Sequence, residues 1–132
     1  MKKQNLRLFL TFCVCMLSIN NYAYDAKVNG IYYNFSDTEA TVTYLHRGSD
    51  NKNAYNDNVT IPKTVDYRGK TYPVTSIGSY AFRYCTGMTK IHLPVSIQKI
   101  DSCAFSNCKG LTNIPIPNSV TDIGVEAFYQ CI

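Results

Sequence analysis

A pattern of apolar positions recurs every 23 residues through the C-terminal half of the chain. An isoleucine, an alanine, a phenylalanine and a cysteine each return three times at this spacing. The residues are Ile77, Ile100 and Ile123; Ala81, Ala104 and Ala127; Phe82, Phe105 and Phe128; and Cys85, Cys108 and Cys131. A fixed period of this length indicates a solenoid, in which each turn of the chain buries its apolar face against the turns beside it.

The apolar spacing within one unit predicts a short helix followed by a short strand. Five residues fall on one stripe of such a helix: Ile77, Ala81, Phe82, Cys85 and Met88. The next apolar residues, Ile91 and Leu93, alternate with polar ones as in a strand, and Pro94 ends it. We therefore expect an α/β solenoid, with a narrow parallel sheet on one face and a row of short helices on the other.

The segment that precedes the repeats has the two-residue alternation of antiparallel strands. It is clearest in the runs 31–35 and 40–45. Between Val65 and Val74 the chain inserts a predicted hairpin around Gly69. The expected organisation is an N-terminal β-rich cap with this hairpin insertion at residues 24–73, followed at 74–132 by two complete repeats and a truncated third.

The first 23 residues have the pattern of a secretory signal peptide. A basic segment, Met1–Arg7, precedes an apolar run, Leu8–Leu17, and a small residue follows at Ala23. Ten residues are too few for a helix that spans a bilayer, and no later stretch of the sequence is long and apolar enough to do so. We expect residues 1–23 to be removed on export, which leaves a secreted or cell-surface protein.

The charge balance of the mature chain is obtained by leaving out the predicted signal peptide, here called the leader. Without Lys2, Lys3 and Arg7, ten basic residues stand against nine acidic ones. This near-neutral balance argues against a nucleic-acid partner, which would need a concentrated basic patch. The length of 132 residues, with 45% hydrophobic residues, fits one domain.

The unit can be written Val-x-x-Ile-Gly-x-x-Ala-Phe-x-x-Cys-x-x-Leu-x-x-Ile-x-Ile-Pro, and over residues 74–132 it resembles the leucine-rich repeats of BspA-like surface proteins. Those proteins occur in bacteria of the Bacteroides kind and in some mucosal protozoa. Upstream, residues 59–62 resemble the strand end of an earlier turn. The resemblance implies a secreted or cell-surface protein that binds host proteins or other cells, and it brings no family-wide catalytic residues or cofactor.

The cysteines at 85, 108 and 131 are interpreted as a stack of buried thiols, because they recur at a core position. An oxidising compartment would allow a disulfide between neighbours, but three in a row cannot all pair. Cys103 takes the place that Tyr80 and Glu126 have in the other units, which predicts an exposed helix position and a free thiol.

Metal binding and catalysis are not expected. A zinc site needs four convergent ligands, and neither His46 nor His92 lies at metal-ligand spacing from the cysteines. A cysteine nucleophile needs a histidine beside it, whereas the repeat places His92 on the outward side of a strand. Asp101 and Asp122 are interpreted as helix N-caps rather than as a catalytic pair.

Two classes of function remain open. In the first, outward repeat positions bind a protein; the candidates are Tyr80, Arg83, Tyr84, Lys90, His92 and Asn113. In the second, the repeats are a structural spacer or cap within a larger surface protein, with no binding role of their own. The third unit stops before its strand and has no polar capping turn, so we expect self-association or fraying at this end.

Overall fold

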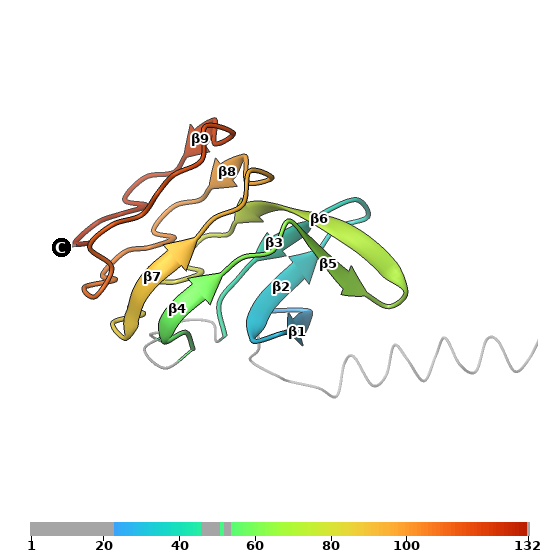
Figure 1. Ribbon diagram of the computed structural model, residues 1–132, viewed down its shortest axis with the longest axis horizontal. Coiled ribbons are helices and arrows are strands. Elements are labelled where there is room, and N and C mark those ends of the chain that lie inside the picture. The colour runs from blue at the N-terminus through green and yellow to red at the C-terminus, as the bar shows by residue number, and fades with distance from the viewer. Residues whose placement is uncertain (1–22, 46–50, 52–53, 132) are drawn as a thin grey trace, which may run out of the picture.

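The computed structural model describes residues 23–45, 51 and 54–131 (Figure 1). The predicted signal peptide, apart from Ala23, lies outside these residues, as does His46. The described part consists of strands joined by turns: β1 (Ala26–Val28), β2 (Ile31–Phe35), β3 (Ala40–Val42), β4 (Asp57–Thr60), β5 (Thr64–Tyr67), β6 (Lys70–Ile77), β7 (Met88–His92), β8 (Lys99–Ile100) and β9 (Asp122–Ile123).

Two rows of parallel strands form two sides of the solenoid. The first row is β3, β6, β8 and β9, and the second is β4 and β7. In the first row Ile77 pairs with Ile100, which pairs with Ile123, so the 23-residue period of the sequence is the register of the sheet. Figure 1 shows the successive coils rising from β4 and β7 towards β9 near the C-terminus.

The third side of each coil differs from the expected short helix, since the described residues contain strands and turns but no helix. Tyr80 and Tyr84 have left-handed backbone angles, with φ of 62° and 60°, which an α-helix cannot contain. The amides of Ala81 and Cys85 bond only three residues back, to the carbonyl oxygens of Gly78 and Phe82. This side is therefore a chain of tight turns.

Hydrogen bonds between coils replace the bonds that a helix would make internally. The amides of residues 80, 82 and 84 donate to the carbonyl oxygens of residues 102, 104 and 106, at 3.2, 2.8 and 2.9 Å. The amides of residues 103, 105 and 107 donate in the same way to residues 125, 127 and 129, at 3.0, 2.7 and 2.7 Å. The turn side is thus stabilised by stacking, which explains why one coil in isolation would not form it.

The second coil lacks the strand expected around Ile114 and Ile116. In the first coil His92 pairs with Thr60, and the residue one period later is Pro115. Proline has no N–H to donate to a ladder, so the β4–β7 row ends at β7 within the described residues. There is also no helix for Asp101 to cap; its carboxylate instead forms an ion pair with Lys99 at 2.8 Å.

The hairpin inserted before the repeats is formed by β5 and β6, and its turn is Arg68–Gly69, with φ of 50° and 78°. Both residues are left-handed, as a two-residue hairpin turn requires. The insertion also explains a change of period. Val59 pairs with Ile91, 32 positions on, where the later coils pair at 23.

The N-terminal segment caps the stack with β1, β2 and β3, which pair antiparallel, and β3 then runs parallel to β6. Tyr55 links the N-terminal strands to the segment before β4, because its buried hydroxyl accepts the Tyr32 amide at 3.1 Å and donates to the Thr43 carbonyl at 3.0 Å. Burial raises the pKa of this hydroxyl.

Aromatic rings form a continuous column through the core. Tyr55 contacts Phe82 at 4.6 Å between ring centroids, Phe82 stacks on Phe105 at 5.1 Å, and Phe105 stacks on Phe128 at 5.4 Å. The last two pairs are within 8° of parallel. Such contacts add to the free energy gained by burying the rings.

Candidate binding surfaces

The repeat-core residues are less buried in the last coil than in the two coils before it. Ile77, Ala81, Phe82 and Cys85 are buried, and so are their counterparts Ile100, Ala104, Phe105 and Cys108, together with Ala127. Ile123 lies at the predicted register but is 55% exposed, and Phe128 and Cys131 are partly buried. These three lack a following coil among the described residues.

The cysteines of the repeats form a second ladder between coils. The Cys108 thiol donates to the Phe82 carbonyl at 2.9 Å, and the Cys131 thiol donates to that of Phe105 at 2.9 Å. All four described cysteines are free thiols. Burial raises the pKa of Cys85 to about 12 and raises that of Cys108. The ladder is therefore structural, because a nucleophile must be a thiolate.

The six predicted binding residues do not form one site. Tyr80, Arg83 and Tyr84 lie on the turn side of the first coil, whereas Lys90 and His92 lie on β7, on another side. Lys90 pairs with Asn58 and His92 with Thr60, so these four exposed residues form a polar row, and exposed Asn113 follows one period after Lys90. The structure thus separates a turn-side group from a strand-side group.

The turn-side group is a cluster of two tyrosines and an arginine. The Arg83 guanidinium carbon lies 5.3 Å from the centre of the Tyr80 ring and 4.8 Å from that of Tyr84. The Tyr44 ring, which the sequence did not single out, meets Tyr80 edge-on at 6.5 Å. Tyr80 is 42% exposed, and Arg83 Nε is buried without a hydrogen-bond partner among the described residues. We call these four residues the Tyr–Arg cluster.

Cys103 borders the Tyr–Arg cluster on the next coil. Its thiol lies 3.8 Å from a carboxylate oxygen of Glu126. Burial, and then the Glu126 carboxylate, raise the pKa of Cys103, which keeps it protonated. The expected free thiol is present, at a left-handed turn position rather than on a helix.

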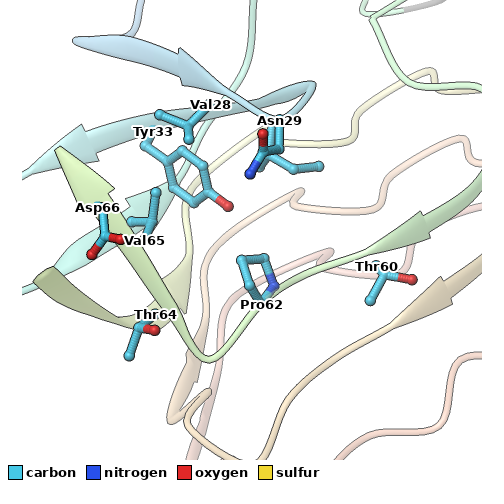
Figure 2. A pocket seen from close by; sticks show the side chains of 9 residues that line it. Val28, Asn29, Tyr33, Thr60, Pro62, Thr64, Val65 and Asp66 are labelled. Atoms are coloured by element: carbon cyan, nitrogen blue, oxygen red, sulfur yellow. The ribbon is translucent and has the colours of Figure 1, made fainter.

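Two adjoining hollows lie in the N-terminal cap, between β4 and the turn that joins β1 to β2. Their volumes are about 350 and 370 Å³, and both are lined by Asn29, Ile31 and Thr60. Figure 2 shows the first, in which the Tyr33 hydroxyl points into the hollow between Asn29 and Pro62. Sequence reasoning missed this site because its residues come from several segments and belong to no repeated motif.

The open end of the stack carries a smaller hollow of about 250 Å³, lined by residues that include Leu111, Ile114 and Phe128. In the last coil Ile123 is also 55% and Val125 76% exposed. This apolar surface is what a further coil would cover.

Neither a metal-binding cluster nor a membrane-spanning helix is present in the described ranges. There, no group of three or more His, Cys, Asp or Glu side chains is placed to hold a metal ion. The same residues contain no helix long and apolar enough to cross a membrane.

Comparison with known proteins places the chain among repeat proteins. The model of the BspA-type leucine-rich repeat region matches residues 51–132, and so begins upstream of the boundary at 74 expected from the sequence. A leucine-rich repeat protein from Bacteroides ovatus ATCC 8483 is 33% identical, with a TM-score of 0.66 over 82% of this chain and 33% of its own. A leucine-rich cell surface protein from Faecalibacterium prausnitzii A2-165 is 28% identical, with a TM-score of 0.62 over 78% of this chain and 27% of its own.

The chain therefore spans about a third or less of the length of these two relatives. No curated protein matches it. The match over residues 51–132, the 23-residue register and the similarity to these two structures agree. The chain belongs to the BspA-type leucine-rich repeat family.

Proposed function

We propose that this chain is an exported leucine-rich repeat module that binds another protein through the Tyr–Arg cluster. Export is supported by the leader pattern of residues 1–23 and by the description of the Faecalibacterium relative as a cell surface protein. Leucine-rich repeat proteins generally serve as binding modules, which favours a protein ligand over a substrate.

The observation that carries the proposal is the state of Arg83. Its guanidinium is held against the rings of Tyr80 and Tyr84, and within the described part of the chain Nε is buried without a hydrogen-bond partner. Arg83 is half-buried, so a carboxylate of a partner protein can pair with the part of its side chain that stays accessible, and arginine binds carboxylates through two parallel hydrogen bonds. Tyrosine and arginine are also the residues that most often dominate protein interfaces. The cluster favours an acidic site on another protein as the ligand, and the family resemblance implies a host extracellular or cell-surface protein.

The test measures binding of the exported chain to cultured host epithelial cells and to a panel of purified extracellular matrix proteins. Arg83→Ala and Tyr80→Ala should each weaken binding about tenfold or more, because such anchors contribute roughly 2 kcal/mol or more. Lys63→Ala, an exposed cation away from the cluster, is the control and should bind as the unaltered chain does. Equal binding by Arg83→Ala and the unaltered chain would refute the role of the cluster.

The strand-side group is tested in the same assay. If Lys90→Ala and His92→Ala weaken binding while Arg83→Ala does not, the binding surface is the polar row along β4 and β7 instead. The two groups lie on different sides of the coil, so one substitution does not disturb the other.

A second candidate function is that of a spacer whose last coil stacks on another protein segment. The exposed Ile123 and Val125 and the apolar hollow beside Phe128 favour it. For the chain alone, the same surface would drive self-association. Light scattering across a concentration series should then show a dimer that Val125→Lys converts to a monomer, while Val95→Lys, at another exposed valine, leaves it unchanged. A chain that is monomeric at all concentrations would argue against self-association.

A further inference from the structure

The outer edge of β4 is an open strand edge. Within the described residues β4 pairs with β7 alone. The amides of Asp57 and Ile61 donate towards β7, to the carbonyl oxygens of Gly87 at 2.9 Å and His92 at 3.0 Å. Peptide groups alternate sides along a strand, so the N–H and C=O groups of Asn58 and Thr60 point away from β7.

That open edge faces the two hollows of the cap. Asn58, Val59 and Thr60 line one hollow, and Thr60 continues into the other. The opposite wall is the β1–β2 turn, where Asn29 and Gly30 have φ of 48° and 85°. Two left-handed residues in succession make a tight hairpin turn. The open edge therefore lies in a walled groove, which we call the cap groove.

The floor of the cap groove carries an unused hydrogen-bonding group. Tyr33 is only 1% exposed, and its hydroxyl points into the groove (Figure 2). This hydroxyl forms no hydrogen bond with the residues that the structure describes. Burial raises the pKa of Tyr33 to about 12, so the hydroxyl stays protonated and can donate. Because Tyr33 lines the hollow, this hydroxyl is open to a ligand that enters the groove.

The lining of the cap groove is suited to polypeptide. Its side chains offer neutral donors and acceptors, namely Asn29, Asn56, Asn58, Thr60 and Thr64. Among the lining residues Asp66 is the one carboxylate, and no cation is present, which favours a neutral or basic occupant. A saccharide would normally stack on an exposed aromatic face, but the ring of Tyr33 is buried.

We propose that the cap groove binds a short extended peptide segment of a partner protein, which adds to β4 as a further strand. Its backbone bonds to the N–H and C=O groups of Asn58 and Thr60, and one of its carbonyl oxygens accepts from the Tyr33 hydroxyl. Addition of a strand to an open sheet edge is a recurrent mode of peptide recognition. Four residues of strand extend about 13 Å, which is the length that β4 offers. This site does not depend on the Tyr–Arg cluster.

The test uses a synthetic probe and nuclear magnetic resonance of the ¹⁵N-labelled chain after leader removal. The probe is an eight-residue peptide of alternating threonine and valine with lysine at each end, acetylated and amidated. We expect saturable shift changes at the amides of Asn29, Asn58 and Thr60. The same peptide with every amide N-methylated cannot donate and should cause no such changes.

Two variants locate the site. Thr60→Pro removes an N–H on the open edge and leaves the bonds to β7 intact, so it should weaken binding at least tenfold. Tyr33→Phe removes only the hydroxyl and should weaken binding about fivefold, the usual effect of one hydrogen bond. Tyr129→Phe, on the last coil, is the control and should bind normally. Arg83→Ala should also bind normally, which separates this site from the Tyr–Arg cluster.

Three results would overturn the proposal: equal binding of the N-methylated probe, no shift changes in the cap groove at millimolar probe, or normal probe binding by a folded Thr60→Pro. If Thr60→Pro does not fold, the N-methylated probe and the Tyr33→Phe variant still test whether the groove binds a peptide. Chitohexaose serves as a saccharide probe, and shift changes in the groove with it but not with the peptide would assign the groove to glycans and refute a peptide site.

Discussion

Phe105→Ala is the substitution from which the stacked core predicts the largest loss of stability. The Phe105 side chain is fully buried, and its ring is stacked between those of Phe82 and Phe128 at centroid distances of 5.1 and 5.4 Å. Alanine would leave a void in the middle of the aromatic column. The coils on both sides are tied by inter-coil hydrogen bonds, so they cannot move together to fill it.

The expected cost is about 3–5 kcal/mol of unfolding free energy, the usual range for emptying a buried aromatic site. Phe82→Ala should cost a similar amount, because Phe82 is equally buried between Tyr55 and Phe105. Phe128→Ala should cost only about 1–2 kcal/mol, since that ring is partly exposed and stacks on one side. Lys90→Ala, at an exposed position, should change stability by less than about 0.5 kcal/mol.

Urea denaturation at equilibrium measures these differences, followed by far-ultraviolet circular dichroism and by tyrosine fluorescence, because the chain has 11 tyrosines and no tryptophan. The urea slope shows whether the transition stays two-state in each variant. Equal losses for Phe105→Ala and Phe128→Ala would refute the reasoning, because they would mean that the last ring is as well covered as the central one.

Other predictions concern the last coil, the thiols, a close backbone contact and the leader. Amide hydrogen exchange should show weaker protection from Val120 onward than over residues 97–117. Equal protection would mean that the last coil is as well covered as the one before it. The free energy of unfolding should fall as the pH rises from about 9 towards 12, because the Cys85 thiol ionises near pH 9.0 in the unfolded chain but keeps its proton until about 12 in the folded one. Urea titrations at alkaline pH should show a weaker pH dependence for Cys85→Ala. Gly78→Ala would bring a Cβ within 2.9 Å of the Val42 carbonyl oxygen and should cost about 1–3 kcal/mol in the same assay. N-terminal sequencing of secreted protein should begin just after Ala23, and an intact Met1 on cytosolic protein would contradict export.

The sequence predicted the register of the stack but not the conformation of its turn side. The spacing of Ile77, Ile100 and Ile123 matches the pairing of β6, β8 and β9 because the solenoid repeats both at the same interval. The helix was expected because buried residues at Ala81, Phe82 and Cys85 suit a helical stripe. A series of tight turns buries the same positions, and bonds between residues 22 positions apart leave no local trace in the sequence.

The sequence predicted the outward residues of the turn side and the strand side, but it did not predict the cap groove. Periodicity placed Tyr80 on the expected helix side and Lys90 beside the expected strand, but it did not show that Tyr44 joins Tyr80 and Arg83 in one cluster. The cap groove could not be anticipated, because Asn29, Tyr33 and Thr60 come from separate segments that meet only through the packing of the non-repeating cap.

The inter-coil hydrogen bonds of the turn side all run in one direction, which gives the stack unlike ends. Each coil receives bonds from the coil before it and donates to the coil after it, so the amides of Glu126, Phe128 and Gln130 stand where the next set of donors would be. A segment that continues or terminates this side must therefore supply acceptors, from carbonyl oxygens or acceptor side chains. If two copies met through this end, the N–H donors of one would face the N–H donors of the other. Their apolar side chains could hold them together, but the inter-coil hydrogen bonds could not continue between them. The stack is therefore directional along its axis. On its turn side, the end at the last coil can be extended only by a segment that presents hydrogen-bond acceptors.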